Sequence, residues 1–456
     1  MPFATINPAT GKTEKVFPAH THEEVDRLLD RAVAAFADYR TTSYAERSRH
    51  LITTAELMEG EVPDLARILT SEMGKTFPAA KAEVAKCAVA LRWFAANAER
   101  LLADEHIETA TKASQAYVRY QPLGPVLAIM PWNFPMWQVI RFAAPALMVG
   151  NVGLLKHASN VPQTALAIED LFRRAGLPEG AFQTLLVESQ DVAAIIEDPR
   201  VAAVTLTGSE RAGMSVAATA GHALKKTVLE LGGSDPFIVL PSADLHACVR
   251  TAVTARVQNN GQSCIAAKRF IVHDAVYEEF LDRFTDAMDA LVVGDPFDSN
   301  TDVGPIVSEA QRDELVAQVE AAQAEGATVH AGGKVPDADG WWFPPTVLSG
   351  VNTDMDFARQ EIFGPVAMVF RVPDLDAALQ VPNSTSFGLG SSVWTNHDEE
   401  IRRCVEGIEA GAVFVNAMVA SMPEMPFGGI KRSGYGRELS EVGLKEFANA
   451  KTVWVA

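Results

Sequence analysis

Residues 125–156, PVLAIMPWNFPMWQVIRFAAPALMVGNVGLLK, carry the pattern that decides the fold of this chain. Two short apolar runs, at 126–130 and 152–156, have the length and composition of buried strands. The stretch between them, at 137–149, has the pattern of a helix. A strand, a helix and a second strand in this order predict the crossover unit of a parallel sheet.

The same alternation continues toward the C-terminus. Further buried strands are predicted at 183–187, 203–207 and 226–229, and the helices between them at 163–175, 192–196 and 210–220. A second series begins near Pro236, with strands at 237–240 and 269–272 and helices at 245–259, 275–291 and 309–325. This alternation is typical of an α/β fold with doubly wound open sheets that helices cover on both faces. We therefore expect two such domains, with a boundary near Glu230.

The two ends of the chain depart from this pattern. The first residues, to about 105, predict mostly helix, including a helix capped by Thr21 and an Ala-rich helix at 80–102. The C-terminal segment 444–456 ends in the apolar sequence TVWVA, which favours a strand. A terminal strand has an unpaired edge unless something covers it, so this tail predicts a contact between subunits.

Composition excludes several classes of protein. The 456 residues are 48% hydrophobic and 21% charged, which is typical of a globular chain and not of a disordered or disulfide-stapled one. The net charge of −19 repels phosphate backbones and anionic membranes, so we expect neither a nucleic acid nor a membrane as partner. Four scattered cysteines without metal-ligand spacing predict a reducing compartment and no metal site. The N-terminus lacks the pattern of a signal peptide, and we expect a cytoplasmic protein.

Of the four cysteines, Cys264 has the sequence neighbours that suit a reactive thiol. It ends a polar, glycine-containing turn, NNGQSC at 259–264, and Lys268 and Arg269 follow shortly after it. Partial exposure and positive charge lower the pKa of a thiol and create a nucleophilic thiolate. A structural thiol explains Cys264 equally well from these residues alone, and that is our interpretation of the other three cysteines, Cys87, Cys248 and Cys404.

Three further motifs come directly after predicted strands, and each has two interpretations. Glu230 precedes two glycines and is either a solvent-facing charge or a general base in a dry cleft. Asn133, in the turn PWNFP at 131–135, is either ordinary turn chemistry or a donor to an oxyanion. The turn TGS at 207–209 is either a plain connection or a place where backbone N–H groups bind a phosphate.

In this order, these motifs resemble those of the aldehyde dehydrogenase family. The resemblance runs from end to end and is carried by seven segments: 131–135, Lys156, 207–209, 230–233, 261–264, EIFGP at 361–365 and PFGGIKRSGYGRE at 426–438. It implies that residues 1–229 form N-terminal helices and a Rossmann-like cofactor-binding domain, with an oligomerisation hairpin at about 106–122. It also implies a catalytic domain at 230–425, and a segment 426–456 that returns to the cofactor domain and ends in an oligomerisation tail. A homodimer or homotetramer is then expected.

The resemblance also implies roles for individual residues. Cys264 attacks the aldehyde carbonyl, Asn133 stabilises the resulting oxyanion, and Glu230 activates the water that hydrolyses the thioester. The implied contacts with the cofactor are Trp132, Asn133, Lys156, His157, Ala158, Ser159, Gly208, Ser209, Leu231 and Glu361.

Ser159 indicates which dinucleotide binds. In family members that prefer NAD this position is commonly Glu, whose carboxylate accepts from the ribose 2′-hydroxyl and repels a 2′-phosphate. The small neutral Ser159, with Lys156 nearby, accommodates that phosphate. We therefore expect NADP, with NAD as a weaker cofactor.

The substrate is expected to carry a carboxylate. Within the family, the short N-terminus and the segment LLKHASNV at 154–161 are most similar to bacterial members that oxidise succinate semialdehyde. Arg141 and Trp137 lie one turn apart on a predicted helix, and we expect both to bind the substrate together with Ser263 and Ser421. A structural salt bridge is the competing interpretation of Arg141, and Lys268 and Arg269 are rival anchors.

Two other functions stay open at this point. One is a dehydrogenase of broad specificity that acts on small uncharged aldehydes. The other is a catalytically silent structural or interaction protein, because a fold alone does not fix a function.

Overall fold

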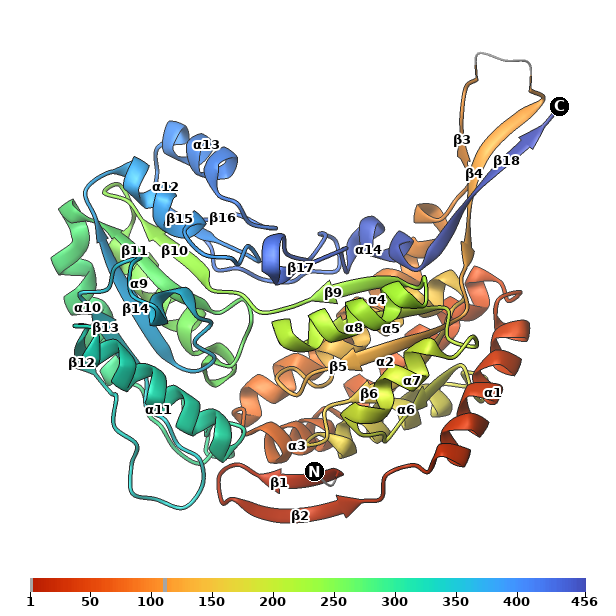
Figure 1. Cartoon of the computed structure of the whole chain (residues 1–456), viewed down its shortest axis with the longest axis horizontal. Helices are drawn as coiled ribbons and strands as arrows, with labels where there is room; N and C mark the ends of the chain where they lie inside the picture. Colours follow the sequence, from red (N-terminus) through yellow and green to blue (C-terminus); the bar gives the residue numbers. More distant parts are fainter. Residues whose placement is uncertain (1–2, 110–112) are drawn as a thin grey trace.

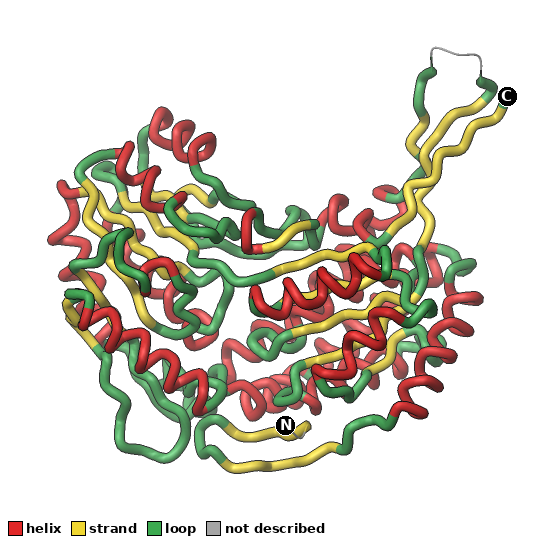
Figure 2. Tube along the Cα trace, viewed as in Figure 1, coloured by secondary structure: helices red, strands yellow, loops and turns green. Residues whose placement is uncertain are grey.

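The structure, a computed structural model, describes residues 3–109 and 113–456. Two sheets lie in two lobes, and a narrow three-stranded arm projects from one of them (Figure 1). Helices lie on both sides of the strands in each lobe (Figure 2). This arrangement confirms the predicted α/β fold with doubly wound sheets. Among the described residues, no helix combines the length and the apolar character needed to cross a membrane.

The six-stranded sheet contains the strand–helix–strand unit at 125–156. Its strands are ordered β17 (Gly434–Tyr435), β9 (Lys226–Glu230), β8 (Ala203–Thr207), β5 (Pro125–Met130), β6 (Val152–His157) and β7 (Phe182–Thr184). All neighbours are parallel except β17 and β9. The helices along this part of the chain are α5 (Trp137–Val149), α6 (Pro162–Arg174), α7 (Val192–Glu197) and α8 (Glu210–His222). The strand predicted at 183–187 is shorter than expected, because 185–187 leave the sheet although they stay buried.

The seven-stranded sheet forms the other lobe. Its strands are ordered β12 (Thr328–Ala331), β13 (Thr346–Ser349), β14 (Val366–Val372), β11 (Ala267–His273), β10 (Asp235–Val239), β15 (Ser392–Trp394) and β16 (Phe414–Val415). Only the β12–β13 pair is antiparallel. Its helices are α9 (Leu245–Val257), α10 (Tyr277–Asp289), α11 (Glu309–Ala324), α12 (Leu375–Asn383) and α13 (Asp398–Gly407). The buried faces of these strands are packed with Val, Ile and Phe, as in parallel sheets covered on both sides.

The N-terminal part is helical, as predicted, but it begins with a hairpin that the sequence analysis missed. β1 (Phe3–Asn7) and β2 (Lys12–Phe17) pair antiparallel before α1 (His22–Tyr39). Most residues of β2 are polar and exposed, so the strand shows no apolar alternation in the sequence. The capping box of α1, formed by Thr21 and Glu24, is present. The helices that follow are α2 (Tyr44–Gly60), α3 (Val62–Met73) and α4 (Phe77–Leu101).

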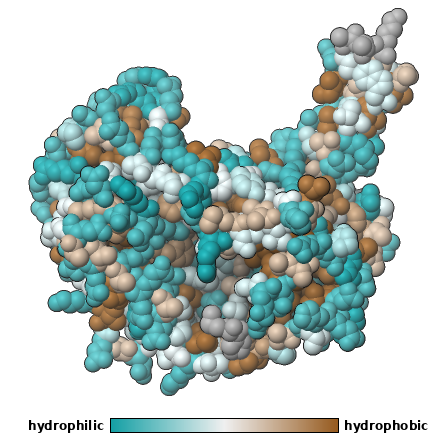
Figure 3. Space-filling view, in the orientation of Figure 1, coloured by the Kyte–Doolittle hydropathy of each residue, from teal (hydrophilic) through white to brown (hydrophobic). Residues whose placement is uncertain are grey.

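The projecting arm contains the C-terminal tail. β18 (Ala448–Val455) pairs with β4 (Gln115–Pro122), which pairs with β3 (Glu105–His106). The predicted strand at 444–456 is shorter than expected, because its first residues belong to α14 (Ser440–Glu446). The hairpin expected at 106–122 includes residues 110–112, which lie outside the described part of the chain. Hydrophobic residues are visible at the surface of the arm (Figure 3). Among the large hydrophobic residues in and next to its strands, Ile107, Trp454 and Val455 are exposed.

The C-terminal segment returns to the first sheet. β17 extends this sheet next to β9, and Phe427, Leu439 and Leu444 belong to the apolar core of the N-terminal lobe. The connection from β9 to β10, which begins after Glu230, leads from one sheet to the other. We therefore propose the division into 1–229, 230–425 and 426–456 as the domain organisation.

Candidate active site

The candidate site lies at the carboxyl ends of the strands of the six-stranded sheet, near the connection from β9 to β10 that leads to the seven-stranded sheet. From β5 the chain continues to β6 and β7 on one side, and β8 and β9 lie on the other side. Such a reversal leaves a crevice at the carboxyl ends of the strands, where ligands bind in open α/β sheets. The turn 131–135 follows β5, and Gly208 and Ser209 follow β8. A cavity lies at this edge, lined among others by Trp132, Asn133, Gly208, Ser209, Leu231, Cys264, Glu361 and Phe363.

Asn133 and the cysteine loop are joined directly. The Nδ2 of Asn133 donates to the carbonyl of Gln262 over 3.2 Å. In return, the Nδ2 of Asn259 donates to the carbonyl of Asn133 over 2.7 Å. Two loops that lie far apart in the sequence therefore hold one another, and the Asn133 amide lies at the residues that precede Cys264.

The backbone before Cys264 has an unusual conformation. Asn259 and Asn260 both have φ of 57°, and Gly261 has φ of 75°. Left-handed backbone is costly for residues other than glycine and persists where the surroundings hold it. These residues form the short 3-10 turn η2 (Gln258–Gly261), which is why α9 ends two residues earlier than predicted. A Cβ on Gly261 would lie 2.4 Å from the backbone of Gly364, so the 361–365 segment packs tightly on this loop.

Cys264 is partly exposed and lines the cavity, but its environment differs from the one expected. Burial raises the pKa of the Cys264 thiol to about 11, although Arg141 and Lys268 oppose the shift. Of the two interpretations of Cys264 left open by its sequence, a thiol with a lowered pKa does not agree with this environment. The reason is the desolvation of the sulfur, which outweighs the opposing charges of Arg141 and Lys268. Lys268 itself bonds the carbonyls of Ser263 and Cys264 and pairs with Glu361 at 3.5 Å. The resting thiol is protonated at neutral pH and requires a base before it can attack.

Glu230 lies at the end of β9 with 2% of its surface exposed. Neither of its carboxyl oxygens bonds another described residue. Burial raises the pKa of Glu230 well above its usual value, and the nearby Glu438 adds to the shift, while Arg141 opposes it. A Cβ on Gly428 would lie 2.5 Å from Oε1 of Glu230, so only glycine leaves room for this carboxyl group. A buried carboxylate with a raised pKa suits a general base near neutral pH.

Arg141 is the charge partner that links these groups. Its guanidinium pairs with Glu438, donates to Oγ1 of Thr207 over 3.1 Å and lies 4.7 Å above the Phe427 ring. The side chain is 2% exposed. The geometry favours the competing interpretation of Arg141 as a salt-bridge residue, and its contact with a substrate stays a prediction.

The rival cations are engaged elsewhere. Arg269 donates to three backbone carbonyls, those of Ser234, Val381 and Pro382, and is 2% exposed. Lys268 is fully buried in the bonds given above. Both side chains therefore stabilise the loops around Cys264, and neither is free to bind a substrate carboxylate.

Of the other predicted substrate contacts, Trp137 and Ser421 touch one another. Trp137, at the start of α5, donates its Nε1 to Oγ of Ser421 over 3.0 Å. Ser421 lines a second cavity with Ile265, Phe427 and Gly428. Ser263 is fully buried beside Cys264, and its hydroxyl has no partner among the described residues.

The predicted cofactor contacts fall into two groups. Trp132, Asn133, Gly208, Ser209, Leu231 and Glu361 line the cavity that contains Cys264. Ser209 also caps α8 by accepting from the backbone N–H of Ala212, which directs the helix N-terminus at the cavity. The Glu361 carboxylate accepts from the N–H of Gly233 over 3.0 Å, and burial raises its pKa while Lys268 opposes the shift.

Lys156, His157, Ala158 and Ser159 form the second group, at the end of β6. Lys156 is 8% exposed and makes no hydrogen bond or ion pair with the described residues, and burial lowers its pKa. Ser159 is held by its backbone, whose carbonyl accepts from Ala4 of β1. The ring of His157 instead faces the 131–135 turn: Nε2 lies 2.8 Å from the carbonyl of Pro135, and Nδ1 accepts from Ala158. Burial lowers the pKa of His157 to about 4, so the neutral ring positions this turn.

Three residues with clear structural roles were missed in the sequence. Glu438 ends the C-terminal motif but was given no role, although a lone carboxylate after a glycine-rich segment was a usable signal. Glu83 accepts from the backbone N–H groups of Met136 and Trp137, each over 2.9 Å, and pairs with Lys75. Lys86 bonds Ser421. Glu83 and Lys86 lie in an Ala-rich helix, and their sequence pattern is that of an ordinary helix surface.

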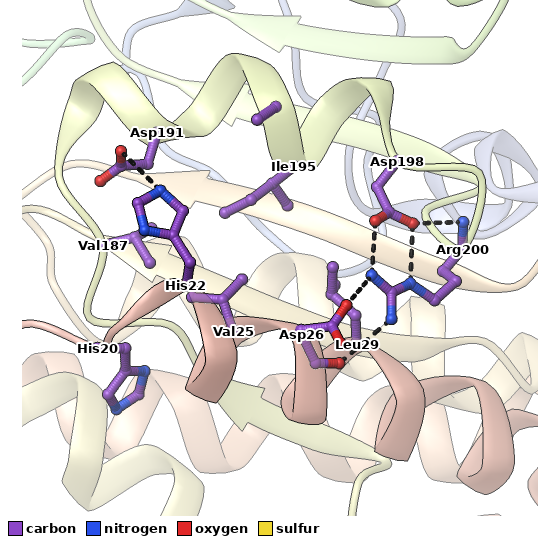
Figure 4. Close-up of a pocket in the computed structure, with 11 residues that line it drawn as sticks. His20, His22, Val25, Asp26, Leu29, Val187, Asp191, Ile195, Asp198 and Arg200 are labelled. Carbon is purple, nitrogen blue, oxygen red and sulfur yellow. Dashed lines mark hydrogen bonds and ion pairs between the residues drawn. The ribbon is translucent and has the colours of Figure 1, made fainter.

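Another depression lies between α1 and α7 and contains none of these residues (Figure 4). Its cation, Arg200, pairs with Asp26, Asp30 and Asp198 at 2.6–2.7 Å. His22 lies 4.0 Å from Asp191 at its other end. The Arg200 pairs occupy the guanidinium, and they join α1 to the segment around α7.

Known proteins resemble this chain over its whole length. Residues 1–453 match the model of the aldehyde dehydrogenase family. A protein of Mycobacterium tuberculosis (strain H37Rv), named succinate-semialdehyde dehydrogenase [NADP(+)] 1, is 61% identical over the full length of both chains. A succinate-semialdehyde dehydrogenase [NADP(+)] of Mycobacterium avium is 59% identical over 100% of this chain and 97% of that protein. The crystal structure of succinic semialdehyde dehydrogenase from Streptococcus pyogenes with NADP+ superposes with a TM-score of 0.97, at 37% identity and 99% coverage of both chains.

Proposed function

Since this chain belongs to the aldehyde dehydrogenase family, we propose that it oxidises succinate semialdehyde to succinate with NADP. The observation that carries the proposal is the cavity that Asn133 and Cys264 line together, with Leu231, the residue after Glu230, in its wall, in a chain that is 61% identical to relatives named for this reaction. NADP, when bound, supplies the nicotinamide that accepts a hydride from the substrate.

Covalent catalysis begins with Cys264. Its thiol gives up a proton and attacks the aldehyde carbon, which forms a C–S bond and an oxyanion. We assign Glu230, which precedes the cavity-lining Leu231, as the base for this proton, and its raised pKa gives its carboxylate a higher proton affinity than that of an ordinary Glu. Arg141 and Lys268 stabilise the thiolate electrostatically, since both oppose the rise of the thiol pKa.

The oxyanion is stabilised by the Asn133 amide and the backbone N–H of Cys264. Asn133 Nδ2 carries two protons, of which the carbonyl of Gln262 accepts one. The other proton is free for the oxygen of the bound aldehyde. Preorganised donors of this kind contribute about 2.7–4 kcal/mol each to the stabilisation of a transition state.

Hydrolysis of the Cys264 thioester completes the reaction. Glu230, once it has released the thiol proton to solvent, removes a proton from water, the water oxygen adds to the acyl carbon, and the thiolate leaves as succinate forms. Because neither oxygen of Glu230 bonds another described residue, the carboxylate is available for this water.

Residues that line the crevice, together with Lys156 and Ser159 at the end of β6, fit NADP. The N-terminus of α8, with Gly208 and Ser209, offers backbone N–H groups and a positive helix end to the diphosphate. Lys156 is an ammonium without an anionic partner in the described chain, and the neighbouring Ser159 adds no negative charge. We assign Lys156 and Ser159 to the ribose 2′-phosphate and Glu361 to the nicotinamide ribose.

An aldehyde panel with both cofactors tests the proposal. We expect NADP-dependent oxidation with higher kcat/KM for succinate semialdehyde than for butanal, and higher kcat/KM with NADP than with NAD. Cys264→Ala should abolish turnover and still bind NADP in a fluorescence titration, because the thiol is needed for the covalent step only. Equal kcat/KM for both aldehydes would favour the broad-specificity alternative, and no reduced cofactor with any aldehyde would favour a silent protein.

The arm supports an assembly of identical subunits. One edge of β18 has no strand partner among the residues that the structure describes, and Trp454 and Val455 are 47% and 44% exposed. Edge strands with exposed apolar residues are suited to pairing with another chain. We propose a homodimer or homotetramer in which this arm contacts a second subunit, and the cytoplasm as its location, where Cys264 stays reduced.

A further inference from the structure

Lys86 on α4 is a cation that the mechanism above does not use. Its Nζ donates to Oγ of Ser421 over 2.9 Å and lies 4.2 Å above the Trp137 ring. The side chain is partly buried, and it has no carboxylate partner among the described residues. Glu83, one turn earlier on the same helix, is already bonded to Lys75, Met136 and Trp137. A partly buried ammonium without a counter-ion is costly, so this arrangement suits an anion that binds there.

Ser421 connects this ammonium with the reaction centre. Its oxygen accepts from both Lys86 and Trp137, which leaves its own O–H free to donate. The cavity lined by Ser421 also contains Ile265, which follows Cys264, and Gly428, which lies against Glu230. The wall of this cavity thus contains direct neighbours of the nucleophile and of the base, and Ser421 adds a hydroxyl donor that the Lys86 ammonium contacts.

We propose that Lys86, with the Ser421 hydroxyl, binds the distal carboxylate of the substrate and so determines the preference for an aldehyde acid. This inference rests on the proposed function. Trp137 positions both groups, since its ring lies under the ammonium and its N–H bonds the hydroxyl. Arg141, Lys268 and Arg269 are less suited to this task because Glu438 and backbone carbonyls already occupy them.

The test compares two substrates and two lysines. Lys86→Met keeps the length of the side chain and removes its charge. Lys81→Met is the matched control, because Lys81 lies on the same helix, 4.7 Å above the ring of Phe77, but is exposed. We expect Lys86→Met to lower the ratio of kcat/KM for succinate semialdehyde over butanal by about 10- to 100-fold, as for a lost charge pair. Lys81→Met should keep the parent ratio.

An unchanged ratio in Lys86→Met would overturn the inference. A parent enzyme that does not prefer succinate semialdehyde would instead overturn the proposed function, so the two failures are distinguishable. Binding gives a readout without turnover. In a Cys264→Ala background, calorimetric titration with succinate should show a Kd raised about 10-fold or more by Lys86→Met. An equal Kd in both proteins would also contradict a role of Lys86 in binding the carboxylate.

The pH dependence of the substrate preference provides a further test, which uses a second variant at Lys86. Burial lowers the pKa of Lys86 to about 8, and Arg141 lowers it too, while Cys87, Glu83 and Cys264 act in the opposite direction. The ammonium is charged below this pH, so the ratio of kcat/KM for the two aldehydes should fall above about pH 8 in the parent. Ionisations of Cys264 and Glu230 affect both aldehydes and cancel in the ratio. Lys86→Arg, which stays charged, should keep the ratio flat to pH 9.5, and a fall like that of the parent would overturn the inference even if Lys86→Met does not fold.

Discussion

At the scale of single residues, the carboxyl group of Glu230 controls the second half of the reaction. Its pKa is raised above the usual range, and a base acts only when it is deprotonated, so kcat should fall as the pH drops through this raised value. The acid limb of the kcat profile should therefore lie above pH ~4.3, the value for an ordinary Glu. Glu230→Gln should release at most one equivalent of NADPH per site and then stop. Steady turnover by Glu230→Gln would remove Glu230 from thioester hydrolysis.

Ser159 is the residue that should set the choice of dinucleotide. Ser159→Glu places a carboxylate beside the site assigned to the 2′-phosphate, where it repels that phosphate and accepts from a 2′-hydroxyl. We expect the ratio of kcat/KM for NADP over NAD to fall about 10- to 100-fold, because a charge-assisted hydrogen bond contributes ~1.5–3 kcal/mol. Ser159→Gln, of similar size but neutral, separates charge from bulk. If both variants change the ratio equally, charge is not the cause.

Sequence reasoning located the reactive residues but not their surroundings. Cys264, Asn133 and Glu230 each lie in a recognisable local motif, because the residues of one loop are consecutive in the sequence. Their electrostatic environment comes from distant segments: Glu438 reaches Arg141 from nearly three hundred residues away. The sequence showed two cations near the thiol but not the burial that raises its pKa. Desolvation depends on everything that packs around the sulfur, and no short stretch of sequence contains that information.

At the scale of elements, Glu83 of α4 holds the start of α5. α5 has no side-chain cap of its own, and the Glu83 carboxylate accepts from its first backbone N–H groups. The same carboxylate forms a buried pair with Lys75. Glu83→Ala leaves these donors and the ammonium unpaired, so we expect the free energy of unfolding to fall by about 3–5 kcal/mol. Chemical denaturation measures this loss.

A double variant sharpens this prediction. Lys75→Met combined with Glu83→Gln replaces the buried pair by neutral groups and keeps an acceptor for α5. It should be more stable than Glu83→Ala, because no buried charge is left without a partner. A loss below about 1 kcal/mol in Glu83→Ala would show that water or a shift of α5 replaces the carboxylate.

Helices and strands with a clear hydrophobic pattern in the sequence were predicted close to their observed bounds. Elements without such a pattern were missed or given wrong bounds. α5 has the predicted bounds, Trp137–Val149, because its composition and its flanking turns coincide. β2 was missed because its side chains are exposed and polar, and α9 was predicted too long because the left-handed Asn259 and Asn260 have no helix-breaking side chain. Both errors arise where tertiary contacts, not local propensity, determine the backbone.

At the scale of the whole molecule, the arm should determine the oligomeric state. Trp454→Asp introduces a charge at the exposed end of β18, and we expect it to shift the assembly toward smaller species in light scattering. Val16→Asp is the matched control, since Val16 is 60% exposed on β2, a strand of another sheet. A monomeric parent would contradict the proposed assembly, and an unchanged assembly in Trp454→Asp would place the contact elsewhere.

The late position of β17 and Glu438 has a consequence for biosynthesis. At ~5–20 residues per second, the roughly 200 residues between Glu230 and Gly434 take on the order of 10–40 s to translate. During this interval the emerging N-terminal lobe has an unpaired edge at β9, and Arg141 lacks its counter-charge. Free edges of this kind favour aggregation. A nascent chain released by the ribosome before residue 434 would contain the nucleophile and the base, yet it would be a client for chaperones and not a partly active enzyme.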